Sequence, residues 1–195
     1  MRRRIVLAAP AVLAACGLSE RPYVERRDWP LDIANPSPRP SPRRGEVLLV
    51  RAIRAGPGLD ARGLQSIQPD GSIRTSFYEE WAVPPAEGVE DALRRWLAAS
   101  GRFAAVTASG SRLSADLVLE GELTALWSEP AEGVARAAIG ITVLRERGVN
   151  ETVRLARAFS ATAPLPDKTP QGEVEGMRAA LAAVFRQIET ALARG

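Results

Sequence analysis

The chain has 195 residues, with 26 lysines and arginines against 23 aspartates and glutamates, no histidine and a single cysteine. The absence of histidine excludes Ser-His-Asp and Cys-His catalysis and any metal site that depends on imidazole, and without a Gly-Lys-Ser/Thr motif there is no P-loop. Three basic residues, Arg2, Arg3 and Arg4, lie at the extreme N-terminus. The remainder of the chain is close to neutral, so we expect no nucleic-acid binding. Because these catalytic and metal-binding motifs are missing, we also expect no catalytic residues, metal or cofactor.

The N-terminus has the pattern of a bacterial lipoprotein signal peptide. Arg2 to Arg4 precede an apolar run of eleven residues, Ile5 to Ala15, which is shorter than the roughly 20 residues of a membrane-spanning helix. Cys16 follows Leu13-Ala14-Ala15 and resembles the cysteine of a lipobox, whose thiol takes a diacylglyceryl group and acyl chains such as palmitate. We predict a signal peptide over residues 1–15 and lipidation of Cys16. An ordinary secretory cleavage site and an uncleaved anchor are the alternatives.

Residues 16–45 form a proline-rich segment, with the densest part at residues 35–42. Such a sequence neither pairs in a sheet nor builds a helix, so we expect a lipidated N-terminus and an extended tether of about 3.1 Å per residue. A tail without a spacing function is the alternative, and Tyr23 and Trp29 are candidates for packing back on the domain. The folded domain is expected over residues 46–195.

The first half of this domain combines short strands with one helix. Apolar and β-branched residues predict strands over 47–54, 64–67 and 72–80, the last two joined by a tight turn at Asp70-Gly71. Pro84-Pro85 begin a helix that runs to residue 99, and a short strand follows at 103–106. The apolar residues of the helix recur at three- and four-residue spacing and predict a buried face, with Trp96 in the core: Val89, Leu93, Trp96 and Leu97.

The second half predicts a meander and a long helix. Apolar residues occupy every second position over 113–127, and similar runs follow over 135–143 and 153–161. Thr169 is placed as N-cap and Pro170 as the first residue of a helix to residue 192. The fold class is therefore α+β: a two-layer sandwich with a mostly antiparallel sheet of about six strands and two helices packed on one face.

Several segments together resemble one known family. They are the lipobox, the proline-rich segment, the strand over 47–54, the run from Tyr78 to Pro85, the Leu97-x-x-Ser100-Gly101-x-Phe103 pattern and the strand Ala115 to Gly121. This order is similar to that of the ABC-type transport auxiliary lipoproteins, the PqiC-like family associated with MCE-domain lipid transporters, and the likeness covers about residues 46–193.

The resemblance implies a non-catalytic lipoprotein that faces the periplasm and serves an ABC/MCE-type intermembrane lipid transport system. Its partners would be an MCE-domain protein, whose periplasmic channel it anchors or completes, and the bilayer through acylated Cys16. Gly17 stands where an aspartate would favour the inner membrane, so the outer membrane is preferred. An envelope-assembly scaffold without a role in lipid transport is the alternative, and exposed strand edges leave a homo-oligomer open.

Two aromatic residues, Tyr78 and Trp81, are the candidates for partner binding, because they stand at a strand end beside Pro84-Pro85. Packing against the domain's own core is the alternative for both. Trp127 lies at the end of a long strand and is left open. Glu120 and Glu122 share a strand face, but nothing predicts the pocket and unequal environments of an acid-base pair, so they are expected to be solvated.

Overall fold

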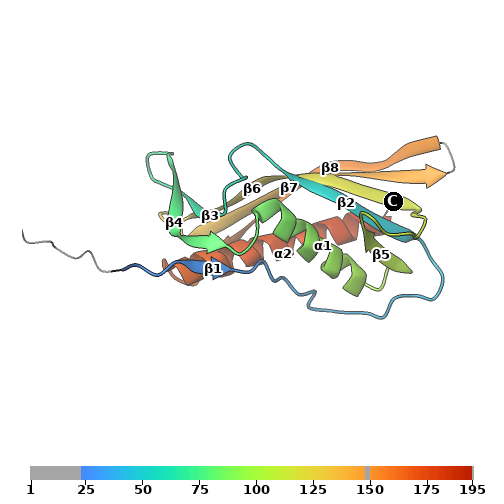
Figure 1. The fold of residues 1–195 in the computed structure, drawn as a ribbon, viewed down its shortest axis with the longest axis horizontal. Coiled ribbons are helices and arrows are strands. Elements are labelled where there is room, and N and C mark those ends of the chain that lie inside the picture. The colour runs from blue at the N-terminus through green and yellow to red at the C-terminus, as the bar shows by residue number, and fades with distance from the viewer. Residues whose placement is uncertain (1–22, 148–149, 195) are drawn as a thin grey trace, which may run out of the picture.

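The computed structural model describes residues 23–147 and 150–194. Within these residues the chain forms eight strands and two helices (Figure 1). In chain order they are β1 (Arg27–Trp29), β2 (Val47–Ala55), β3 (Gly63–Ile67), β4 (Ile73–Trp81), α1 (Pro85–Ala99), β5 (Ala105–Ala108), β6 (Leu117–Glu129), β7 (Val134–Arg147), β8 (Asn150–Pro164) and α2 (Pro170–Arg194). None of the helices in the described part has the length and apolar character needed to cross a membrane.

The strands form one mixed sheet, centred on β6. Along one edge β6 pairs with β7, which in turn pairs with β8, and these two pairings are antiparallel. Along its other edge β6 pairs in parallel with β2 and, near its end, with β3 at Ser66–Ser128. β2 continues to β5 in parallel, and β3 continues to β4 and then to β1.

The expected fold class is therefore confirmed only in part. An α+β architecture with two helices is correct, and the β6–β7–β8 meander is present. The expectation of about six mostly antiparallel strands is wrong, because the described residues contain eight strands and four of their seven pairings are parallel. Alternation of apolar residues has the same period in both kinds of sheet, so it does not show which strands run parallel.

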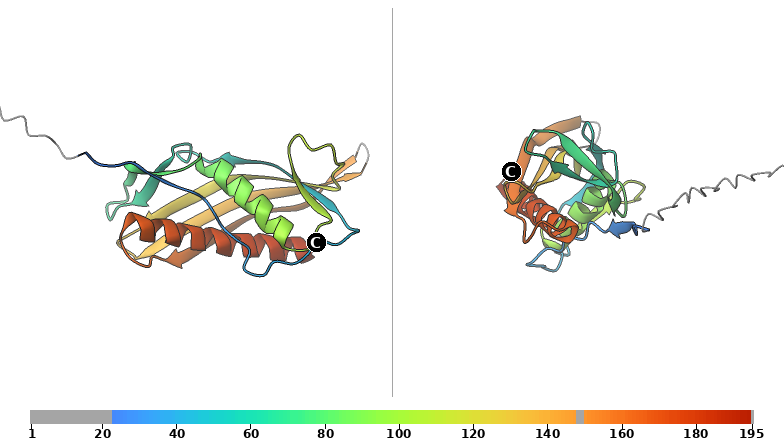
Figure 2. Two further views of the ribbon diagram at one scale, coloured as in Figure 1. Left: turned by 60° about the horizontal axis from the view of Figure 1, so that its bottom comes forward. Right: turned by 90° about the vertical axis from the view of Figure 1, so that its left-hand side faces the viewer.

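Both helices lie on the same face of the curved sheet (Figure 2). Thr169 caps α2 as predicted, since its Oγ1 accepts a hydrogen bond from the Gly172 amide at 3.1 Å. The expected apolar stripes of both helices are buried, and the Trp96 ring meets Phe185 edge-on at 5.7 Å. Each of these stripe residues is at most 3% exposed: Val89, Leu93, Trp96, Leu97, Val174, Met177, Leu181, Val184, Ile188 and Leu192.

The proline-rich segment is not a free tether throughout. β1 adds to the sheet beside β4, and Leu31 and Ile33 are each only 5% exposed. The segment then crosses the outer side of both helices (Figure 2), where Asn35 donates to the Trp96 carbonyl of α1 at 3.3 Å and to the Glu189 carboxylate of α2 at 3.4 Å. The folded part therefore begins well before residue 46.

Candidate functional site

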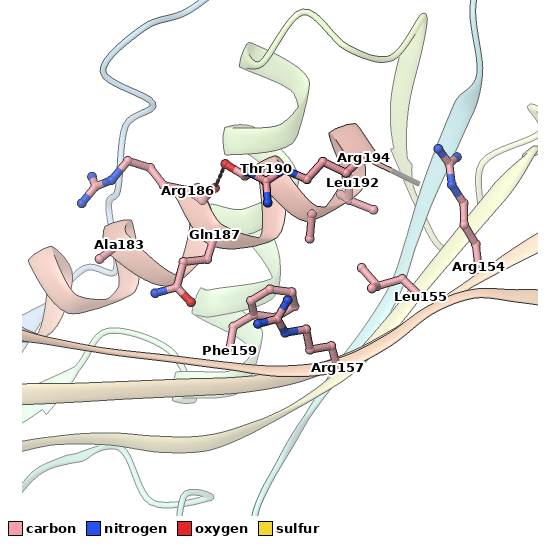
Figure 3. A pocket seen from close by; sticks show the side chains of 11 residues that line it. Arg154, Leu155, Arg157, Phe159, Ala183, Arg186, Gln187, Thr190, Leu192 and Arg194 are labelled. Carbon is pink, nitrogen blue, oxygen red and sulfur yellow. Dashed lines mark hydrogen bonds between the residues drawn. The ribbon is translucent and has the colours of Figure 1, made fainter.

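A groove of about 760 Å³ opens between β8 and the C-terminal half of α2 (Figure 3). Its lining combines apolar side chains with four arginines, and none of its lining residues carries a carboxylate. The lining residues are Arg154, Leu155, Arg157, Phe159, Ala183, Arg186, Gln187, Thr190, Ala191, Leu192 and Arg194. The groove is thus both apolar and cationic.

Strand geometry places Arg157 inside this groove. Successive side chains of a strand alternate between its two faces, so Arg157 shares the helix-facing side of β8 with Leu155 and Phe159. Leu155 packs against the core and Phe159 is 4% exposed, whereas Arg157 is exposed. Its guanidinium lies 5.3 Å from the centre of the Phe159 ring, a cation–π contact that covers the ring.

A β-bulge positions the second arginine of β8. The β7–β8 register changes from Val143–Leu155 to Leu144–Val153, so Arg154 has no partner residue on β7. Bulges of this kind redirect a side chain relative to the regular pleat. Arg154 reaches Glu46, with Nη1 and Oε2 2.9 Å apart, and its Nε atom is buried without a hydrogen-bond partner among the described residues.

Glu46 neutralises one side of this arginine group. Burial opposes ionisation of its carboxylate, but hydrogen bonds from Arg154 and Arg145 outweigh that effect and hold the pKa of Glu46 below its ordinary value. Arg157 has no such partner, since it forms no ion pair within the described ranges. The groove therefore keeps an unneutralised cation beside apolar surface, which suits an anion that carries a hydrocarbon part.

A second surface of interest is the aromatic end, defined as Phe77 and Tyr78 of β4. These side chains are 68% and 44% exposed. The Phe77 and Tyr78 rings meet edge-on at 5.2 Å, and the Arg26 guanidinium lies 4.9 Å from the Phe77 ring centre. Adjoining large apolar side chains that are exposed are typical of contact surfaces.

The structure separates the two predicted partner-binding residues. Tyr78 belongs to the aromatic end, and its contact with a partner stays a prediction. Trp81 is 1% exposed and sits in the core, which is the alternative that the sequence left open for it. Trp81 is the last residue of β4, and its backbone amide donates to the Arg62 carbonyl at 2.7 Å.

The remaining candidates have simple surroundings. Glu120 lies 2.7 Å from the Arg51 guanidinium in an exposed ion pair, and the Trp127 indole donates to Glu129 at 3.0 Å. Tyr23 is exposed, whereas the Trp29 indole of β1 donates to Glu79 at 2.7 Å. Cys16 lies outside the described residues. No cluster of three or more carboxylates, cysteines or histidines in the described part of the chain is placed to hold a metal.

Sequence reasoning missed the groove, although β8 carries a signal for it. The alternating apolar positions of this strand include Leu155, Phe159 and Ala161, and Arg157 interrupts them. A charged residue in a helix-facing row indicates a place that the helix leaves uncovered. The other side of the groove comes from α2, more than 20 residues further along the chain, and no local pattern reveals that pairing.

An arginine-lined apolar groove and an exposed aromatic cluster are features of a domain that binds ligands or partners. The chain belongs to the family described as the ABC-type transport auxiliary lipoprotein component, whose model matches residues 30–189. It is therefore an auxiliary component of ABC-type transport. The match begins at Pro30, which agrees with the packing of Leu31 and Ile33 into the domain. Among curated proteins, none matches the chain significantly in sequence.

Solved structures share the fold. An uncharacterised protein superposes with a TM-score of 0.68 at 13% identity, over 86% of this chain and 99% of its own. A Xanthomonas campestris protein of the DUF330 family gives 0.63 at 21% identity, over 81% and 88%. A hypothetical protein from Chlamydia trachomatis gives 0.54 at 12% identity, over 76% and 96%. At these identities the likeness concerns the fold alone.

Proposed function

We propose that this protein is a non-catalytic, periplasm-facing lipoprotein that assists an ABC transporter and its MCE-domain protein in moving lipid between the two membranes. The observation that carries the proposal is the family membership over residues 30–189. The protein anchors or completes the periplasmic channel of the MCE protein, while ATP hydrolysis belongs to another subunit. Acylated Cys16 ties it to the outer membrane.

The position of the first described residues supports this arrangement. Seven residue steps separate Cys16 from Tyr23, and a chain of that length spans at most about 25 Å. β1 and β4 lie together at the end of the domain where the chain enters (Figure 1). An anchor at Cys16 therefore holds the aromatic end near the bilayer, with the rest of the domain extending into the periplasm.

The aromatic end also has the composition of a protein contact. Tyrosine, phenylalanine and arginine are enriched at the centres of interfaces, and the two aromatic side chains present large area with little conformational freedom to lose. Arg26 and Tyr78 flank the Phe77 ring and restrict it before a partner arrives. We assign the contact with the MCE protein to this end.

Photocrosslinking tests the assignment. A photoreactive phenylalanine analogue replaces Tyr78 in the full-length acylated protein, in cells that produce it at native level, and the crosslinked species is identified by mass spectrometry. The matched control replaces Val153, which is 65% exposed on β8. An MCE-domain protein crosslinked from position 78 and not from 153 supports the proposal. Crosslinks that reach only envelope proteins unrelated to transport refute it and favour the scaffold role.

A further inference from the structure

We infer that the groove between β8 and α2 binds a single anionic amphiphile, with its phosphate group on Arg157 and its hydrocarbon chain against Leu155, Ala183 and Ala191. This goes beyond an accessory role, because it gives the domain itself a lipid ligand. It rests on the proposed function only for the source of that ligand. The groove's own residues specify the chemistry.

The charges of the groove select an anion. Four arginines and no carboxylate line it, and Arg154 is the one of these four that pairs with Glu46, which also binds Arg145. Arg157 stands over Phe159 with its hydrogen-bond donors free of any ion pair in the described part of the chain. A guanidinium presents planar, paired donors that match the oxygens of a phosphate group. Figure 3 shows Arg157 projecting into the space between β8 and Gln187 of α2.

The shape and lining of the groove favour a ligand with a hydrocarbon part over a free ion. Its volume of about 760 Å³ lies within the range of roughly 300 to 1,000 Å³ that is typical of small-molecule sites. Leu155, Ala183, Ala191 and Leu192 supply apolar surface beside the cation. An inorganic phosphate would leave that apolar surface exposed to water, whereas the hydrocarbon of a single-tailed or short-chain phospholipid covers it.

A protein strand is the competing occupant, because β8 is an outer strand of the sheet. The Gln187 side-chain amide, however, donates to the Ser160 carbonyl of β8 at 3.0 Å. This bond uses a backbone acceptor that an added strand would need. The groove mouth is therefore closed to strand pairing at this point and open to a smaller ligand.

Calorimetric titration of the mature chain carrying Cys16→Ser tests the inference, with dihexanoyl-phosphatidylglycerol as probe at concentrations where it is monomeric. Dihexanoyl-phosphatidylcholine and inorganic phosphate are the comparison ligands. We expect the anionic lipid to bind tighter than both. Arg157→Gln should weaken it about tenfold or more, the loss expected for one charged hydrogen-bonded contact. Ala183→Trp, which fills the apolar part, should weaken both lipids.

Arg112→Gln is the matched control, because Arg112 is exposed in the loop before β6 and does not line the groove. It should bind like the parent, and circular dichroism should show that every variant is folded. Equal affinity of Arg157→Gln and the parent overturns the inference, as does equal affinity for phosphate and lipid. Dimerisation that Arg157→Gln abolishes, without lipid binding, also overturns it. The crosslinking experiment at Tyr78 has an independent outcome, so the two proposals can fail separately.

Discussion

Replacing Leu31 by alanine should destabilise the domain, although residue 31 lies in a segment with the composition of a linker. Leu31 is 5% exposed and rests on α1 at Gly88, where an added Cβ would come within 2.7 Å of the leucine Cδ1. Leu→Ala removes three carbons, or roughly 2.4 kcal/mol at about 0.8 kcal/mol for each buried methylene. Buried Leu→Ala changes cost about 2 to 5 kcal/mol, and a segment on the surface can partly collapse, so we expect about 2 to 3 kcal/mol.

For a domain of this size, each kcal/mol lowers the Tm by about 2 to 4 °C, so Leu31→Ala should melt roughly 4 to 12 °C below the parent. Thermal unfolding of the mature chain by circular dichroism measures this. Val24→Ala is the control, because Val24 is 51% exposed and such changes stay within about 0.5 kcal/mol. If Leu31→Ala melts together with Val24→Ala, the segment is a free tether in solution and the packing argument is wrong.

Three further changes have expected outcomes. Gly88→Val should lower the Tm much as Leu31→Ala does, and the two should be less than additive in a double-mutant cycle, because both displace one contact. Burial raises the pKa of Glu173, against a hydrogen bond from Ser128 and the charge of Arg74. Folding therefore favours the protonated carboxyl more than the unfolded chain does, and the stability that this confers below the unfolded pKa is lost as the pH rises through the folded pKa. Glu173→Gln should then raise the Tm at pH 8 and change little near pH 4. Phe77→Ser should leave the Tm within about 2 °C but reduce the Tyr78-dependent crosslink, whereas Val153→Ser should not.

The helices could be predicted closely because their signals are local. Thr169 and Pro170 mark the start of α2, and the spacing of Val89, Leu93 and Trp96 marks the buried face of α1. Each signal depends on residues within a few turns of one another. The same holds for the β6–β7–β8 meander, since short connections favour antiparallel neighbours.

Strand alternation misled the prediction where the register changes. The apolar positions of β6 were expected on one face as far as Trp127, but the β6–β7 pairing shifts between Leu123 and Ala125. After this irregularity Leu126 and Ser128 are buried and Trp127 is only partly buried. One extra residue exchanges the two faces of a strand, and sequence alone does not show where the extra residue lies.

The parallel pairings and β1 could not be predicted because their partners are distant in sequence. β1 pairs with β4 about fifty residues later, and β2 pairs with β6 about seventy residues later. A three-residue strand between prolines has no periodicity to detect. The burial of Leu31 depends on the space left by Gly88 on another element, so composition indicated a linker where tertiary packing forms part of the domain.

The two surfaces lie at opposite ends of the longest helix, and this separation bears on how the groove could receive a lipid. Arg74 of β4 lies 3.9 Å from Glu173 in the first turn of α2, so this end of the helix lies against β4. The last turn of α2, with Leu192 and Arg194, borders the groove. A helix of 25 residues is about 37 Å long at about 1.5 Å per residue. In the arrangement that we propose, an acylated Cys16 holds the aromatic end near the bilayer, and the groove lies along the half of α2 that is further from it. A lipid in the groove would then be one that has left the bilayer, and the partner protein would deliver or collect it.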